Sequence, residues 1–170
     1  MRQCAVMVIA IAVFVSIVKA QEGKPSFSEE AKRAYDNTKN KVMRAAEKMP
    51  EENYSFQPTK EVRNFGAWVA HLADSQLRTC SLVIGSPRTS GEAKTSKAEL
   101  VATLKESFDT CDEAFNGLTD TNAADLIKTT RGSRSRLMTL VGTQAHSEEG
   151  YGSMAVYMRL KGLVPPSSDR

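Results

Sequence analysis

The sequence predicts an all-α fold, a four-helix bundle preceded by a signal peptide. Apolar residues recur at helical spacing in three segments, a fourth segment is apolar on several sides, and no stretch of five or more residues alternates as a half-buried strand does. The chain has 170 residues, of which 41% are hydrophobic. That length suits one domain with its own core plus a short appendage.

Residues 1–20 form the appendage. Arg2 precedes an apolar run over residues 5–18, and the small residue Ala20 precedes Gln21, which is the pattern of a cleaved secretory signal peptide. The alternative is an uncleaved anchor, but 14 helical residues span only about 21 Å of a hydrocarbon core of about 30 Å. We therefore expect a mature domain over residues 21–170 that is extracytoplasmic, either periplasmic or secreted, with no stable membrane association.

Charge argues against a nucleic-acid partner. Removal of Arg2 and Lys19 from 23 basic residues leaves 21 against 20 acidic ones. The chain has no block of like charge and a single tryptophan, so a phosphate-neutralising stripe is missing.

The first three helices each begin at a capping residue. "SFSE" at residues 26–29 predicts a first helix capped by Ser26 that continues to Met49. An ordered loop over residues 50–62 follows, and Asn64 caps a second helix that ends at Gly85. "SKAE" at residues 96–99 is a capping box that opens a third helix ending at Gly117.

The fourth helix follows a polar stretch over residues 119–134, which we interpret as a loop. Within it, "RGSRSR" is basic and polar, and Ser133 and Ser135 lie near no histidine in the sequence, so a nucleophilic triad lacks support. The helix covers residues 135–162 and ends at Gly162, before two prolines. A helix that is apolar on several sides packs against several neighbours.

Cys80 and Cys111 are the two cysteines that survive processing, and an even number in an exported protein favours a disulfide over two buried thiols. Cys80 lies 16 residues after the cap Asn64, and Cys111 lies 15 after the cap Ser96. The two are level only if the second and third helices are parallel. This predicts up-down-down-up connectivity.

The mature chain has only two histidines, His71 and His146, and both lie in predicted helices. Imidazole is the commonest neutral nitrogen ligand of zinc and related metals. The alternative is a pair of ordinary histidines held by hydrogen bonds.

"MPEENYSFQPTKEVRNFGAWVAHLADSQ", followed downstream by "AHSEEGYGSMAVYMRLKGLVPPSS", resembles the DinB family over essentially the whole mature chain. The resemblance implies a four-helix bundle whose second helix supplies one histidine and whose fourth supplies a His-x-x-x-His pair, which together hold a divalent metal such as zinc, nickel or manganese. His71 matches the first ligand and His146 the second. The third position falls on Gly150, which has no side chain.

Glu149 or Asp74 is a candidate substitute ligand, although a carboxylate shifted by one helical position points about 100° away. Alternatively, no ligand replaces the missing histidine, and the side chain of Glu149 or Tyr157 fills the space that Gly150 leaves. Three protein ligands are usual in a catalytic zinc site.

We therefore expect a degenerate, non-catalytic bundle that binds an unknown small molecule or protein. The alternative is a metal-dependent hydrolase or transferase that uses His71 and His146 with a substitute ligand. A homodimer is compatible with either expectation.

Overall fold

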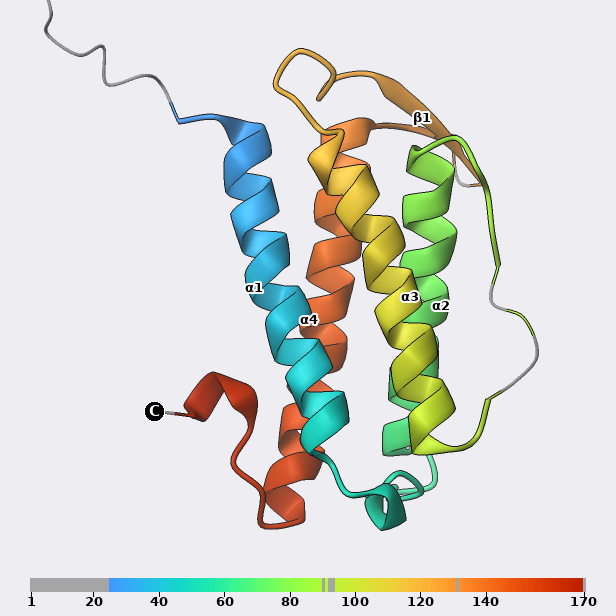
Figure 1. Cartoon of the computed structure of the whole chain (residues 1–170), viewed down its shortest axis with the longest axis vertical. Coiled ribbons are helices and arrows are strands. Elements are labelled where there is room, and N and C mark those ends of the chain that lie inside the picture. The colour runs from blue at the N-terminus through green and yellow to red at the C-terminus, as the bar shows by residue number, and fades with distance from the viewer. Residues whose placement is uncertain (1–24, 90, 92–93, 131, 170) are drawn as a thin grey trace, which may run out of the picture.

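The computed structural model describes residues 25–89, 91, 94–130 and 132–169. It consists of four long helices, α1 (Phe27–Lys48), α2 (Phe65–Val83), α3 (Lys97–Asn116) and α4 (Arg136–Leu160), packed side by side (Figure 1). Short 3-10 turns lie at Glu51–Asn53 and Pro166–Ser168. No helix in these ranges has the length and apolarity needed to cross a membrane. The predicted signal peptide lies outside the described residues.

All four long helices begin at a side-chain cap. Ser26, Asn64, Ser96 and Ser135 each accept a hydrogen bond from a backbone N–H in the first turn of the helix that follows. At Ser96 the reciprocal contact from Glu99 completes the capping box. The caps predicted for the first three helices are confirmed, because these side chains satisfy amides that the helix leaves unpaired.

The core lies between the helices and has large side chains from each of them, including Val42, Phe65, Leu104, Leu140 and Met154, all fully buried. The loop after α1 adds Tyr54, which is buried and donates a hydrogen bond from its hydroxyl to the carbonyl of Ala46 (2.7 Å). These contacts close one end of the bundle by packing.

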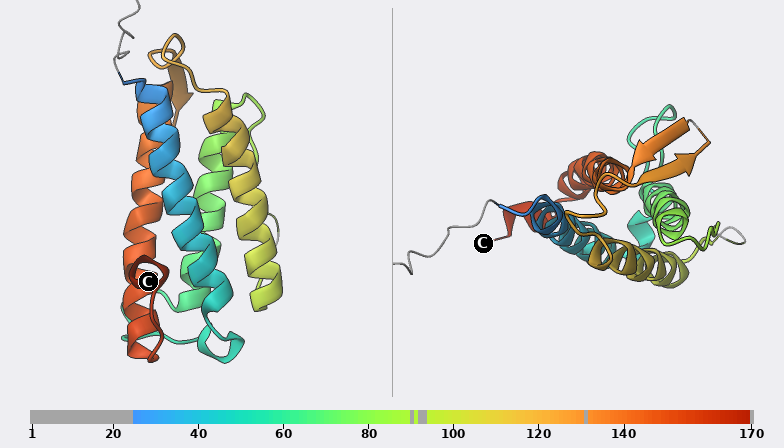
Figure 2. Two further views of the ribbon diagram at one scale, coloured as in Figure 1. Left: turned by 60° about the vertical axis from the view of Figure 1, so that its left-hand side comes forward. Right: turned by 90° about the horizontal axis from the view of Figure 1, so that it is seen from above.

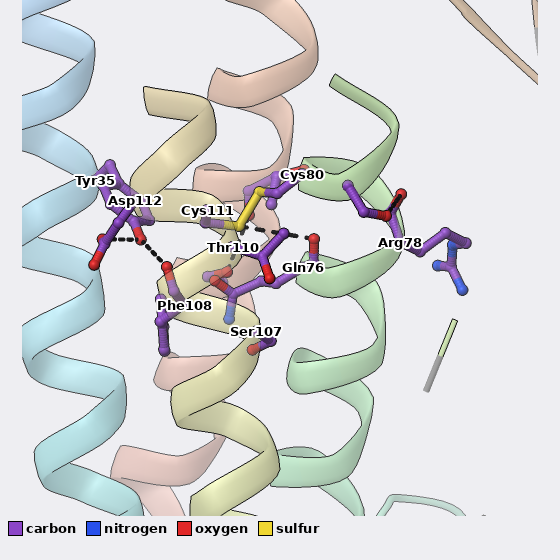
Figure 3. The surroundings of a disulfide bond; sticks show 12 residues. Tyr35, Gln76, Arg78, Cys80, Ser107, Phe108, Thr110, Cys111 and Asp112 are labelled. Carbon is purple, nitrogen blue, oxygen red and sulfur yellow. Dashed lines mark hydrogen bonds between the residues drawn. A yellow bond between two sulfur atoms is a disulfide. The ribbon is translucent and has the colours of Figure 1, made fainter. Parts of the chain in front are cut away.

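A disulfide joins α2 to α3, as the cysteine count predicts. The Cα atoms of Cys80 and Cys111 are 5.0 Å apart and both residues are fully buried. Figure 3 shows the bond in the core, beside Gln76 and Ser107. The enclosed loop, with a sequence separation of 31, corresponds to about 3 to 4 kcal/mol of stabilisation in the chain-entropy model.

In Figure 1, α2 begins at the lower end of the bundle and ends at its upper end, and α3 also begins at the lower end. The chain therefore returns from the upper to the lower end of the bundle between α2 and α3. This course brings Cys80 and Cys111, which lie at similar distances from their caps, to the same level.

The expectation of a loop over residues 119–134 is wrong for its second half. Strands β1 (Leu126–Thr129) and β2 (Gly132–Ser135) form an antiparallel hairpin in which Leu126 pairs with Ser135 and Thr129 with Gly132. Each strand has four residues and little buried surface, so no apolar alternation marks it in the sequence. Gly132 has a φ of +114°, which a residue with a side chain rarely adopts.

The hairpin is anchored to the start of α4. The backbone N–H of Arg136 donates to the backbone carbonyl of Asp125 (2.7 Å), and that of Leu137 donates to the backbone carbonyl of Ala123 (3.0 Å). Seen from above in Figure 2, the hairpin lies on the side of the bundle formed by α4 and α2, away from α1. The strands therefore extend the wall of the bundle where the two histidine-bearing helices meet.

Candidate functional site

His71 of α2 and His146 of α4 face each other across the helix interface. Their Nε2 atoms are 2.9 Å apart, and the two rings are nearly perpendicular, with an interplanar angle of 85°. Sequence reasoning identified both residues, and the structure brings them together.

Contacts with α1, on the side of α4 opposite His146, fix the rotation of α4 about its axis. The carboxylate of Glu148 accepts hydrogen bonds from Lys41 and Thr38 of α1, each at 2.6 Å. Residues two positions apart on a helix are about 200° apart around its axis. With Glu148 held against α1, His146 therefore faces α2.

His71 lies in a partly buried, cationic environment. Burial lowers the pKa of its imidazole, and the nearby Arg63 and His146 lower it further. The guanidinium of Arg63 lies 5.0 Å from the centre of the Trp68 ring, which packs in a T-shaped arrangement with the ring of His71. Burial and the nearby cationic groups therefore favour the neutral form of His71.

Glu149 determines which nitrogen of His146 carries a proton. Its Oε2 lies 3.2 Å from Nδ1 of His146, and a carboxylate only accepts hydrogen bonds, so Nδ1 is the nitrogen that carries the hydrogen. When His146 is neutral, its Nε2 then has a free lone pair and accepts from Nε2–H of His71. The three side chains form a chain of hydrogen bonds from solvent into the bundle.

The third family position is closed by packing. Gly150 is buried, and a Cβ atom built there would lie 2.7 Å from Cδ2 and 2.9 Å from Cδ1 of Leu72. Leu72 is itself fully buried. The expectation that Glu149 or Tyr157 fills this space is wrong, because Glu149 binds His146 and the hydroxyl of Tyr157 donates to the carbonyl of Arg63.

Neither predicted substitute completes a metal site. The side chain of Glu149 is 72% exposed and approaches Nδ1 of His146, the nitrogen remote from His71. Asp74 forms an ion pair with Arg78 at 2.8 Å, one turn along α2. Within the described residues, no three histidine, cysteine, aspartate or glutamate side chains are grouped so that they could hold a metal ion.

The described residues therefore do not fit the three-ligand metal centre that the resemblance implies. The 2.9 Å between the two Nε2 atoms is the length of an ordinary N–H···N hydrogen bond.

A cleft of about 670 Å³ opens beside the histidine pair. One wall is α2, with His71, Ser75, Arg78 and Thr79, and another is α4, with Thr139, Gly142, Thr143 and His146. This volume lies within the range of small-molecule sites, roughly 300–1,000 Å³.

The hairpin forms the remaining wall of the cleft, with Thr129, Thr130, Gly132, Ser133 and Arg134. Sequence reasoning missed these residues as site residues because the hairpin was interpreted as a loop. The available signal was the stretch "RGSRSR", which is rich in hydroxyl and guanidinium groups and directly precedes the helix that carries His146.

The fold and the site define a class of small helical bundle in which the second and fourth helices each direct one histidine at the other. The sequence matches the DinB superfamily over residues 34–148, and the chain belongs to that superfamily. The predicted resemblance is confirmed.

Solved structures agree on the fold. A DinB-like protein from Bacillus cereus has a TM-score of 0.68 at 17% identity, over 81% of this chain and 95% of its own. A DinB-like protein from Bacillus subtilis has a TM-score of 0.65 at 19% identity, over 83% and 99%. A conserved protein from Enterococcus faecalis has a TM-score of 0.62 at 12% identity, over 81% and 98%. No curated protein matches the sequence.

Proposed function

We propose that this chain is an exported DinB-superfamily protein with a degenerate metal site, which binds a ligand in the cleft beside His71 and His146 without catalysing a reaction. The observation that carries the proposal is the close approach of Leu72 to Gly150: the glycine has no side chain to bind a metal, and Leu72 lies where the Cβ atom of a third ligand would be. The hydrogen-bonded pair then has a structural role, joining α2 to α4 at the base of the cleft.

Export is part of the proposal. The signal-peptide pattern over residues 1–20 and the disulfide between Cys80 and Cys111 support an oxidising, extracytoplasmic compartment. The disulfide and the course of the chain in Figure 1 also support the up-down-down-up connectivity.

A second candidate is a metal-dependent hydrolase or transferase. It is favoured by the convergence of the two Nε2 atoms and by Glu149, because ligating histidines commonly donate their other ring N–H to a carboxylate. In such an enzyme His71 and His146 would hold the ion, which would act as a Lewis acid or activate water.

Titration calorimetry with zinc, nickel and manganese separates the two candidates. For wild type we expect dissociation constants weaker than roughly 10 µM, which is about 7 kcal/mol of binding free energy. His71→Ala is the control that identifies binding at the pair. Tight binding that His71→Ala abolishes would favour the enzyme.

A further inference from the structure

The described walls of the cleft are uniformly suited to an anion. Seven of the lining residues carry a hydroxyl group, two carry a guanidinium and two an imidazole, and no described aspartate or glutamate is among them. The chain as a whole is nearly balanced, with 23 basic and 20 acidic residues. The described lining of the cleft is therefore more cationic than the chain as a whole.

Arg134 is the strongest cationic group in the cleft. Its guanidinium lies over α4 at Gly142, where a Cβ atom would be 3.0 Å from Nη1. The glycine thus leaves room for the arginine to reach across from β2. Arg134 forms no ion pair with a carboxylate of the described chain, so its charge is available to a ligand.

Arg78 lies on the α2 wall of the same cleft. It pairs with Asp74 at 2.8 Å, and its side chain is 57% exposed, so its charge is partly neutralised at the rim. One guanidinium therefore comes from each of two walls, and hydroxyl groups lie on all three. Guanidinium groups bind carboxylate and phosphate oxygens through paired N–H donors, and hydroxyl groups satisfy the remaining lone pairs.

We propose that the cleft binds a small molecule through an oxyanion group, a carboxylate or a phosphate, with Arg134 as the principal cationic contact and Arg78 as the second. This inference rests on the proposed function, because it names the class of ligand for the same cleft. It requires neither a metal ion nor turnover.

The test is calorimetric titration of the purified protein with inorganic phosphate, malonate and glucose at constant ionic strength. Constant ionic strength is needed because salt screens exposed charges. We expect saturable binding of phosphate or malonate, no binding of glucose, and a loss of about tenfold or more in affinity in Arg134→Gln. Phosphate binding without malonate binding would identify a phosphate ligand, and the reverse a carboxylate.

Arg33→Gln is the matched control, because Arg33 is an exposed arginine of α1 outside the cleft and should leave the affinity unchanged. Anion affinity that survives in both Arg134→Gln and Arg78→Gln would overturn the inference, and so would binding of glucose alone or of none of the three probes. The proposed function fails on a different result: tight metal binding that depends on His71.

Discussion

Gly150→Ala should destabilise the protein even though alanine is the better helix former. The new Cβ atom would lie 2.7 Å from Cδ2 of Leu72, so this fully buried side chain would have to shift within the core. Overpacking of this kind costs about 1–3 kcal/mol, whereas replacing glycine by alanine inside a helix gains about 1 kcal/mol. We expect a net loss of about 1 kcal/mol in the free energy of unfolding.

Gly152→Ala is the matched control. Gly152 lies on the same helix, is exposed, and has nothing within 4 Å of the position of a Cβ atom. It should therefore gain the full helix-forming benefit of about 1 kcal/mol. The difference between the two variants, about 1–3 kcal/mol, isolates the contact with Leu72 because the helix term cancels.

Urea denaturation followed by circular dichroism at 222 nm measures both variants. In a Leu72→Ala background, Gly150→Ala and Gly152→Ala should change the free energy of unfolding equally, because the Leu72 atoms next to Gly150 are then absent. Equal stabilisation by Gly150→Ala and Gly152→Ala in the wild-type background would refute the argument that packing has closed the third ligand position.

Three further predictions concern pH, the disulfide and export. Because the folded protein lowers the pKa of His71, the unfolded chain takes up its proton first as the pH falls from about 6.5. The melting temperature should therefore decrease from pH 7 to pH 5, and it should decrease less in His71→Gln. An equal decrease in wild type and His71→Gln would contradict this prediction. The double variant Cys80→Ala, Cys111→Ala should lose about 3 to 4 kcal/mol of unfolding free energy, and an unaffected urea midpoint would contradict this. Amino-terminal sequencing of the extracytoplasmic protein should begin at Gln21, and an intact Met1 would exclude cleavage.

Much of the helical framework could be predicted because its signals are local. Ser26, Asn64 and Ser96 mark helix starts by side-chain chemistry that acts within one turn, and the structure has a cap at each of them. The Cys80–Cys111 pair added one long-range constraint, because a disulfide requires two Cα atoms within about 7 Å.

The hairpin could not be predicted in the same way. Its strands are short and mostly exposed, and they are held by backbone hydrogen bonds rather than by burial of an alternating face. Apolar and polar residues alternate along a strand only when one of its faces is buried. A mostly exposed hairpin therefore has the sequence pattern of a loop. The missed hairpin also concealed Ser133 and Arg134 as cleft residues.

The histidine pair was predictable and its environment was not. Two histidines on predicted helices identify candidate ligands, and the family pattern places the missing one at residue 150. That Leu72 occupies the space next to Gly150 depends on the distance between α2 and α4, which no local sequence signal contains.

In the proposed function, His71 and His146 are a hydrogen-bonded pair that remains from a metal site and holds no metal ion. Elemental analysis of the protein, purified without a histidine tag or chelator, tests this claim most directly. The predicted result is zinc, nickel and manganese each well below one ion per chain, in wild type and in His71→Ala alike. One ion per chain in wild type, lost in His71→Ala, would contradict the claim.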